Sequence, residues 1–159
     1  MVLMEKLDLF VTPIWKFKLL GIDNSRLVSH AYSLYEADAE RRYPTAYMQV
    51  DDTSSMKWRS FYLTPAQIKS VSELDKLVNI ATENANKCFL ELNPKKDSSL
   101  HLKECWYNIN GPDEVVSPHL HPGTTLVMTY YIKIPNNSGN IVFQDRKSTR
   151  LNSSHVKRS

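Results

Sequence analysis

The chain has 159 residues, with 20 Lys and Arg against 17 Asp and Glu and a formal net charge of +3. Residues 1–10 carry three charged side chains, and no run of about 18 apolar residues follows, so we expect neither a transmembrane helix nor a secretory signal. Two cysteines, Cys88 and Cys105, are too few for a disulfide framework and indicate a reducing, cytoplasmic compartment.

The N-terminal part of the chain predicts a strand followed by two helices. Residues 7–20 alternate weakly around Pro13 and predict an opening strand, with the proline marking either its start or a sheet edge. Residues 23–25 are good helix caps, and apolar spacing extends the helix that follows to about Arg42.

The second helical pattern is the stronger one. Thr64-Pro65 is typical of a cap followed by a proline in the first turn, and Ser70 with Glu73 matches a capping box. Apolar residues then recur with helical spacing as far as Leu92, and Asn93-Pro94 predicts the end of the helix.

After Leu100 the apolar period changes from helical spacing to alternation. Residues 102–109 predict a strand in which Trp106 and Asn108 share one face, and residues 111–113 predict a turn. Residues 124–134 and 141–144 predict two further strands around a polar loop. Helices followed by an antiparallel meander indicate an α+β fold.

Residues 145–159 are interpreted as a separate, non-native segment. Residues 145–155 read as one frame of a translated sequencing adapter; the alternative is a genuine basic, Ser-rich tail that is disordered. Without this segment, 15 Lys and Arg stand against 16 Asp and Glu, which leaves no clear nucleic-acid surface and no reason to expect membrane binding. Residues 1–144 are then expected to form one partial domain.

His119 and His121 are the chain's candidate metal ligands. They flank Leu120, and two imidazoles at i and i+2 on an extended segment point to the same face, while Leu120 is expected to pack on the opposite face. An iron or zinc centre needs at least one further protein ligand, and the rest of residues 1–144 does not reveal one. His155 is not counted, because it lies in the segment interpreted as non-native.

Several other chemically notable side chains receive structural interpretations. The histidines outside the pair are expected at the surface or at strand edges, the two central tryptophans as core anchors, and the cysteines as packing residues. These residues are His30, His101, Trp58, Trp106, Cys88 and Cys105.

An ordered set of motifs runs through residues 1–144. Its members are Leu9-Phe10, Thr12-Pro13-Ile14-Trp15, Lys57-Trp58-Arg59-Ser60, Trp106, Asn108, His119-x-His121-Pro122-Gly123, Tyr130-Tyr131 and Ser138-Gly139-Asn140-Ile141-x-Phe143. The set resembles a family of 2-oxoglutarate- and Fe(II)-dependent oxygenases found in phages and marine bacteria. The resemblance implies an N-terminal strand and helices packed on a double-stranded β-helix, or jelly roll, of which the chain holds about the first half.

The resemblance also implies a ligand set. The wider superfamily binds its metal with two histidines and a carboxylate, which leaves open positions for the oxo-acid and O₂. His119 matches the first histidine. His121 stands where the carboxylate commonly stands, so either the site uses three histidines or another group binds the metal in its place. The distal histidine and the arginine that binds 2-oxoglutarate are expected downstream, outside this chain.

Asn108 and Tyr130 are the candidate cofactor-binding residues, because related enzymes use an amide or a phenol from these early strands to bind the oxo-acid. The alternative for both is an ordinary polar group satisfied within its strand. Val127-Met128 replaces the Ser-Gly of the family, a change that narrows the implied pocket.

The resemblance implies an Fe(II)- and 2-oxoglutarate-dependent dioxygenase of the hydroxylase type in the cytoplasm of a bacterial or phage-infected cell. This chain would be an incomplete fragment of it, and we expect the fragment to be inactive alone. Its substrate could be a protein side chain, a small molecule or a nucleobase. One alternative is a cupin-like metal enzyme, although residues 124–128 lack the acid that cupins favour. Another is a non-catalytic jelly-roll structural or interaction protein of a phage, which Fe(II) binding would distinguish.

Overall fold

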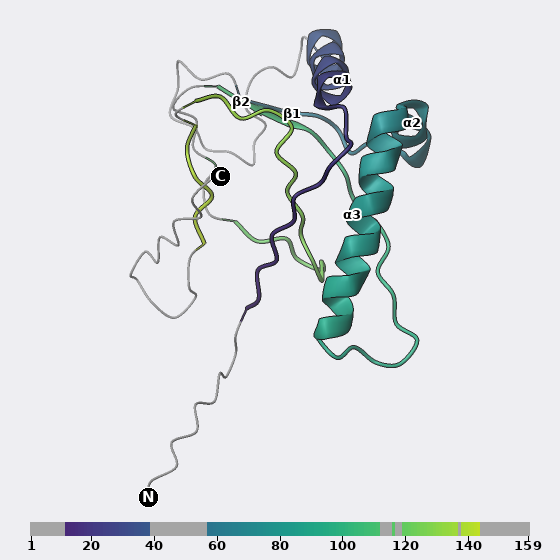
Figure 1. The fold of residues 1–159 in the computed structure, drawn as a ribbon. Helices are drawn as coiled ribbons and strands as arrows, with labels where there is room; N and C mark the ends of the chain where they lie inside the picture. Colours follow the sequence, from purple (N-terminus) through teal and green to yellow (C-terminus); the bar gives the residue numbers. More distant parts are fainter. Residues whose placement is uncertain (1–11, 39–56, 112–115, 117–118, 137, 144–159) are drawn as a thin grey trace, which may run out of the picture.

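The computed structural model describes residues 12–38, 57–111, 116, 119–136 and 138–143. Within these residues the order of elements is α1 (Asn24–Ala37), β1 (Lys57–Arg59), α2 (Pro65–Ser70), α3 (Ser72–Glu91) and β2 (Asn108–Asn110). Figure 1 shows the long helix α3 beside α1 and α2, with the two short strands next to them. Helices and a small antiparallel sheet agree with the predicted α+β class.

Helix α1 begins where the sequence predicts. The Asp23 side chain accepts a hydrogen bond from the Ser25 amide at 3.0 Å, and Leu27 and Ala31, one turn apart, are buried. The helix ends at Ala37, because Asp38 has left helical geometry. The predicted extension to Arg42 is therefore wrong at Asp38, and residues 39–42 lie outside the described part of the chain.

Helix α2 owes its start to a complete capping box. The Thr64 hydroxyl accepts from the Gln67 amide at 3.2 Å, the Gln67 side chain accepts from the Thr64 amide at 2.8 Å, and Pro65 occupies the first turn. The predicted box at Ser70 and Glu73 is wrong. The Ser70 hydroxyl donates back to the Gln67 carbonyl at 2.7 Å, while the Glu73 carboxylate accepts from the Asp23 amide.

Helix α3 buries one face and stops as predicted. Leu74, Leu77 and Cys88 are buried along it, which confirms Cys88 as a packing residue. After Glu91 the chain passes through Asn93 with φ of 50°, a left-handed conformation that asparagine tolerates and that ends helices.

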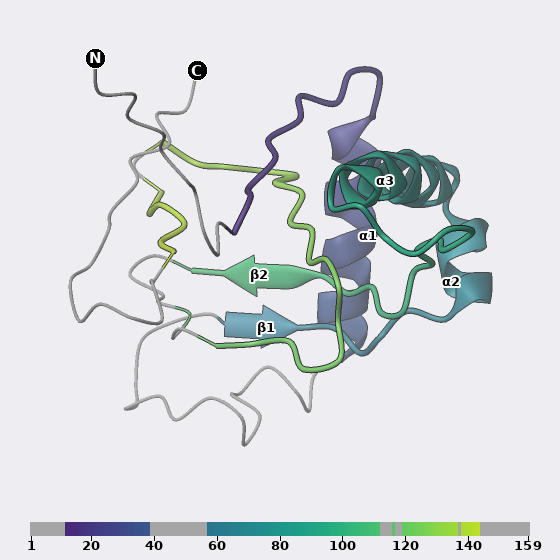
Figure 2. The ribbon, with the colours of Figure 1, turned by 90° about the horizontal axis from the view of Figure 1, so that it is seen from below.

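Strands β1 and β2 pair antiparallel, with Trp58 opposite Ile109 and Arg59 opposite Asn108. The pairing continues past the strands, since the Ser60 amide donates to the Tyr107 carbonyl at 3.0 Å. The sequence predicts residues 108 and 109 of β2 as the end of a longer strand. It predicts no strand over residues 57–59, which form β1. Figure 2 shows the two strands side by side, with the helices on one side of them.

Alternation along the two strands separates a core face from an outer face. Trp58 is only 2% exposed and Tyr107 is buried, whereas Arg59 and Asn108 lie on the opposite face. Trp58 therefore is the core anchor that the sequence predicts. The core that it joins consists of Leu27, Ala31, Trp58, Leu63, Ile68, Leu74, Leu77 and Tyr107.

The described residues do not confirm the expected barrel. Residues 12–20, 124–134 and 141–143 form no strand, so those strand predictions are wrong, and the sheet of the described part of the chain has two strands. Strand propensity alone does not order a backbone, because a strand also needs a neighbour for its hydrogen bonds. Within the described ranges, no helix is long and apolar enough to cross a membrane.

Candidate metal centre

A tight turn follows the two histidines. The Thr124 amide donates to the His121 carbonyl at 3.3 Å, and Gly123 has φ of 70°. Proline at the second position and a positive-φ glycine at the third are typical of a type II turn. Pro122 and Gly123 therefore reverse the chain directly after His121 and restrict where its imidazole can lie.

The structure brings the predicted metal ligands together. The ring centroids of His119 and His121 are 5.0 Å apart at an interplanar angle of 64°. Metal–nitrogen bonds of about 2.1 Å would place two such centroids roughly 4.5 to 5.2 Å apart at one ion. The spacing of the pair therefore fits a shared ion. Leu120 between them is 79% exposed, so the prediction that it packs on the opposite face is wrong.

Trp106 supports His121 from the side of the strands. Its ring stacks on the His121 imidazole, with centroids 5.9 Å apart and an angle of 29°. The Arg59 guanidinium carbon lies 4.5 Å from the Trp106 ring and 4.7 Å from the Tyr62 ring. Trp106 is half-buried, so its prediction as a core anchor is wrong: it joins the histidines to the outer face of β1 and β2.

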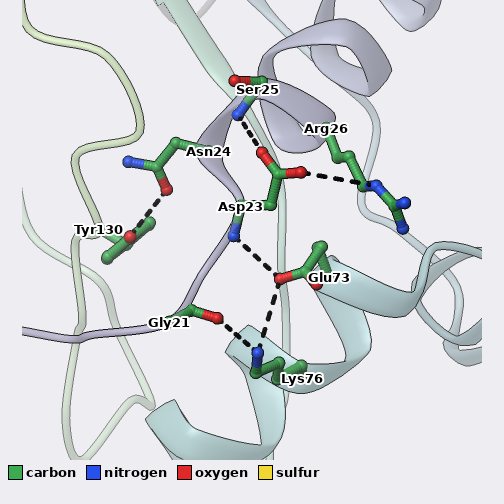
Figure 3. Close-up of polar contacts among 8 residues, drawn as sticks. All are labelled: Gly21, Asp23, Asn24, Ser25, Arg26, Glu73, Lys76 and Tyr130. Atoms are coloured by element: carbon green, nitrogen blue, oxygen red, sulfur yellow. Dashed lines mark hydrogen bonds and ion pairs between the residues drawn. The ribbon is translucent and has the colours of Figure 1, made fainter.

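The two candidate cofactor-binding residues lie in different surroundings. Asn108 is exposed on β2 directly opposite Arg59. The Tyr130 hydroxyl donates to the Asn24 side chain at 2.9 Å, beside the start of α1 (Figure 3). The structure thus places Asn108 on the strand face that leads to His121 and ties Tyr130 to α1. The cofactor roles of both residues stay predictions.

The described residues contain no group of three or more His, Cys, Asp or Glu side chains that could hold a metal ion. The donor set found there is therefore the imidazole pair of His119 and His121. Two neutral imidazoles suit iron or zinc, and an ion of either kind would need a further ligand.

A second polar contact lies on the core face of β2. Tyr107 OH and His30 Nδ1 are 3.2 Å apart, with the rings edge to face at 5.5 Å. Burial raises the pKa of Tyr107 to about 12, with a smaller contribution from Cys105, and burial lowers the pKa of His30. His30 lies on α1 and is half-buried, so it is not at a strand edge, whereas His101 is exposed as predicted.

Residues 104–159 match the sequence model of a family described as "Putative 2OG-Fe(II) oxygenase". The match confirms the suspected resemblance, and its range includes His119, His121, Asn108 and Tyr130. It also includes residues 145–159, while the division of the chain after residue 144 stays a prediction. No curated protein and no solved structure matches the chain.

Proposed function

We propose that this chain, whose residues 104–159 match the 2OG-Fe(II) oxygenase family, binds Fe(II) through His119 and His121 as part of a dioxygenase site that uses 2-oxoglutarate as co-substrate. The observation that carries the proposal is the imidazole pair, with ring centroids 5.0 Å apart, inside the matched range. A bound Fe(II) would supply open coordination positions for the oxo-acid and O₂ and the oxidising chemistry.

The chain's own residues have separate roles in this proposal. His119 and His121 hold the ion, and Trp106 covers one face of the His121 ring and so limits its rotation. Asn108 offers an amide donor for an oxo-acid oxygen. Tyr130 takes the same role only if its hydroxyl leaves Asn24.

Anaerobic titration of the full chain with Fe(II) tests the metal site. We expect the parent to bind one equivalent of Fe(II). Substitution of residues that only contact metal ligands weakens metal binding by about 10- to 100-fold. His119→Ala and His121→Ala should weaken Fe(II) binding by more than this, because each removes a ligand. His101→Ala is the matched control, since this exposed imidazole lies outside the pair and its loss should leave binding unchanged.

Fe(II) binding that is equally strong in the parent and in both variants would exclude the pair as ligands, and no saturable binding by the parent would overturn the proposal that this chain binds Fe(II). Succinate formation from 2-oxoglutarate, compared with the His119→Ala control, tests the reaction separately. Succinate above that control would contradict the expectation that this chain is inactive alone.

A further inference from the structure

We infer that Arg59 is a carboxylate-binding residue beside the histidine pair, with Asn108 as a second donor to the same group. The family resemblance implies an arginine downstream of the histidines, outside this chain. Arg59 lies upstream of them, on β1, and the fold carries it to their neighbourhood through Trp106. That the carboxylate belongs to a substrate or co-substrate rests on the proposed function.

The strand β1 fixes the direction of Arg59. Trp58 and Ser60, its two neighbours, are both buried, and the Ser60 hydroxyl accepts from the Tyr107 amide at 2.9 Å. Because successive side chains on a strand alternate, Arg59 lies on the outer face. Its cross-strand partner there is Asn108, and directly opposed residues have Cβ atoms about 5 Å apart.

Aromatic rings hold the guanidinium in place. The Arg59 guanidinium carbon lies within 4.7 Å of the centroids of both Tyr62 and Trp106, whose rings are themselves 5.6 Å apart. A cation over the faces of aromatic rings is attracted by their quadrupoles, which restricts where the guanidinium can lie. The cation is thus oriented in advance, which lowers the entropy lost when it binds an anion.

The Nε–H group of Arg59 lacks an acceptor. Its Nε atom is buried and has no hydrogen-bond partner, an arrangement that is unfavourable for a charged donor. A carboxylate meets this need best, because its two oxygens match the planar fork of a guanidinium. Tyr62, one of the two rings that contact the guanidinium, is 51% exposed, so the guanidinium lies close to the protein surface.

The ligand that fits is a small organic acid. Arg59 neutralises one carboxylate oxygen pair, and the Asn108 amide on the opposing strand can donate to the same group. The Arg59 guanidinium and the His121 imidazole both contact the Trp106 ring, so the bound acid and the imidazole pair have this ring as a common neighbour. The acid is either the oxo-acid itself or a second, acidic substrate.

Calorimetric titration of the metal-stripped full chain with glutarate, in EDTA, tests the inference apart from the proposed function. We expect saturable binding that Arg59→Lys weakens by about tenfold or more, because lysine lacks the planar fork. Asn108→Ala, at an exposed position, should weaken it less. Arg26→Lys is the matched control, since Arg26 pairs with Asp23 on the surface. The glutarate affinity of this variant should equal that of the parent.

Equal glutarate affinity in Arg59→Lys, Asn108→Ala and the parent, or no binding by a parent whose circular dichroism shows it folded, would overturn the inference. If glutarate binds as expected but Fe(II) does not, the acid site stands and the proposed metal function fails. With Fe(II) bound, competition between glutarate and 2-oxoglutarate identifies the oxo-acid as the ligand. Simultaneous binding identifies a second, acidic substrate.

Discussion

At the scale of single residues, Gly123 connects backbone conformation to the candidate metal ligands. Its φ of 70° belongs to the left-handed region, which residues with a Cβ adopt at a cost of about 1–2 kcal/mol. A Cβ at this position would meet the Lys103 Nζ at 3.9 Å, an ordinary contact. The cost of a substitution there therefore comes from the backbone rather than from a clash.

We predict that Gly123→Ala lowers the free energy of unfolding by about 1 kcal/mol and weakens Fe(II) binding, because the strained turn displaces His121. Urea denaturation and anaerobic Fe(II) titration measure the two effects. Gly139→Ala is the control, since nothing lies within 4 Å of a Cβ there and its φ is not positive. Equal Fe(II) affinity in the two variants would show that the turn does not position His121.

At the scale of elements, side-chain caps determine where the helices begin. Two Ser/Thr-x-x-Glu/Gln patterns lie six residues apart, at Thr64 and at Ser70, and the structure uses the first as a capping box. The N-cap of α3 is Val71, whose apolar side chain cannot accept a hydrogen bond from the first amides of the helix. Its neighbour Glu73 instead accepts from the Asp23 amide and so ties α3 to the start of α1 (Figure 3).

Thr64→Ala is therefore expected to cost about 1 kcal/mol of unfolding free energy, the usual loss for a capping hydroxyl. Ser70→Ala should cost less, because the Ser70 hydroxyl bonds only to a carbonyl of its own helix at 2.7 Å. Urea denaturation followed by circular dichroism at 222 nm compares the two. A larger loss in Ser70→Ala would mean that the cap of α3 lies at Ser70 after all.

At the scale of the whole molecule, the contact between His30 and Tyr107 joins α1 to the β1–β2 pair. Folding takes both groups partly out of water, so the free energy of unfolding depends on pH at both acidic and alkaline pH. Burial raises the Tyr107 pKa from 10.0 to about 12. The contribution of the neutral Tyr107 phenol to the free energy of unfolding is therefore complete below pH 10 and is lost as the pH rises through 12. The His30 pKa falls below 6.5, and its contribution is present above pH 6.5 and is lost as the pH falls.

We predict that the difference in unfolding free energy between the parent and Tyr107→Phe shrinks as the pH rises from 10 towards 12, since phenylalanine keeps the ring but does not ionise. The difference between the parent and His30→Gln should shrink below pH 6.5. Urea denaturation at a series of pH values gives both curves. Differences that do not change with pH would contradict the linkage.

The sequence by itself determined the local features of this protein. The caps at Asp23 and Thr64, the stop at Asn93 and the burial of Trp58 follow from dihedral preferences, capping chemistry and apolar periodicity. These are properties of residues close together in the chain. The histidine pair was visible for the same reason, because an i, i+2 spacing is a local pattern.

Only the tertiary structure decided the contacts between distant segments. Pairing of β1 with β2 brings Arg59 to Trp106, and folding of the segment that carries His121 places its imidazole against the same ring. Such contacts depend on long-range pairing and packing, which override local propensity. For this reason the sequence predicted a core role for Trp106 and strands over residues 124–134, whereas the fold made Trp106 the link between a cation and the histidines.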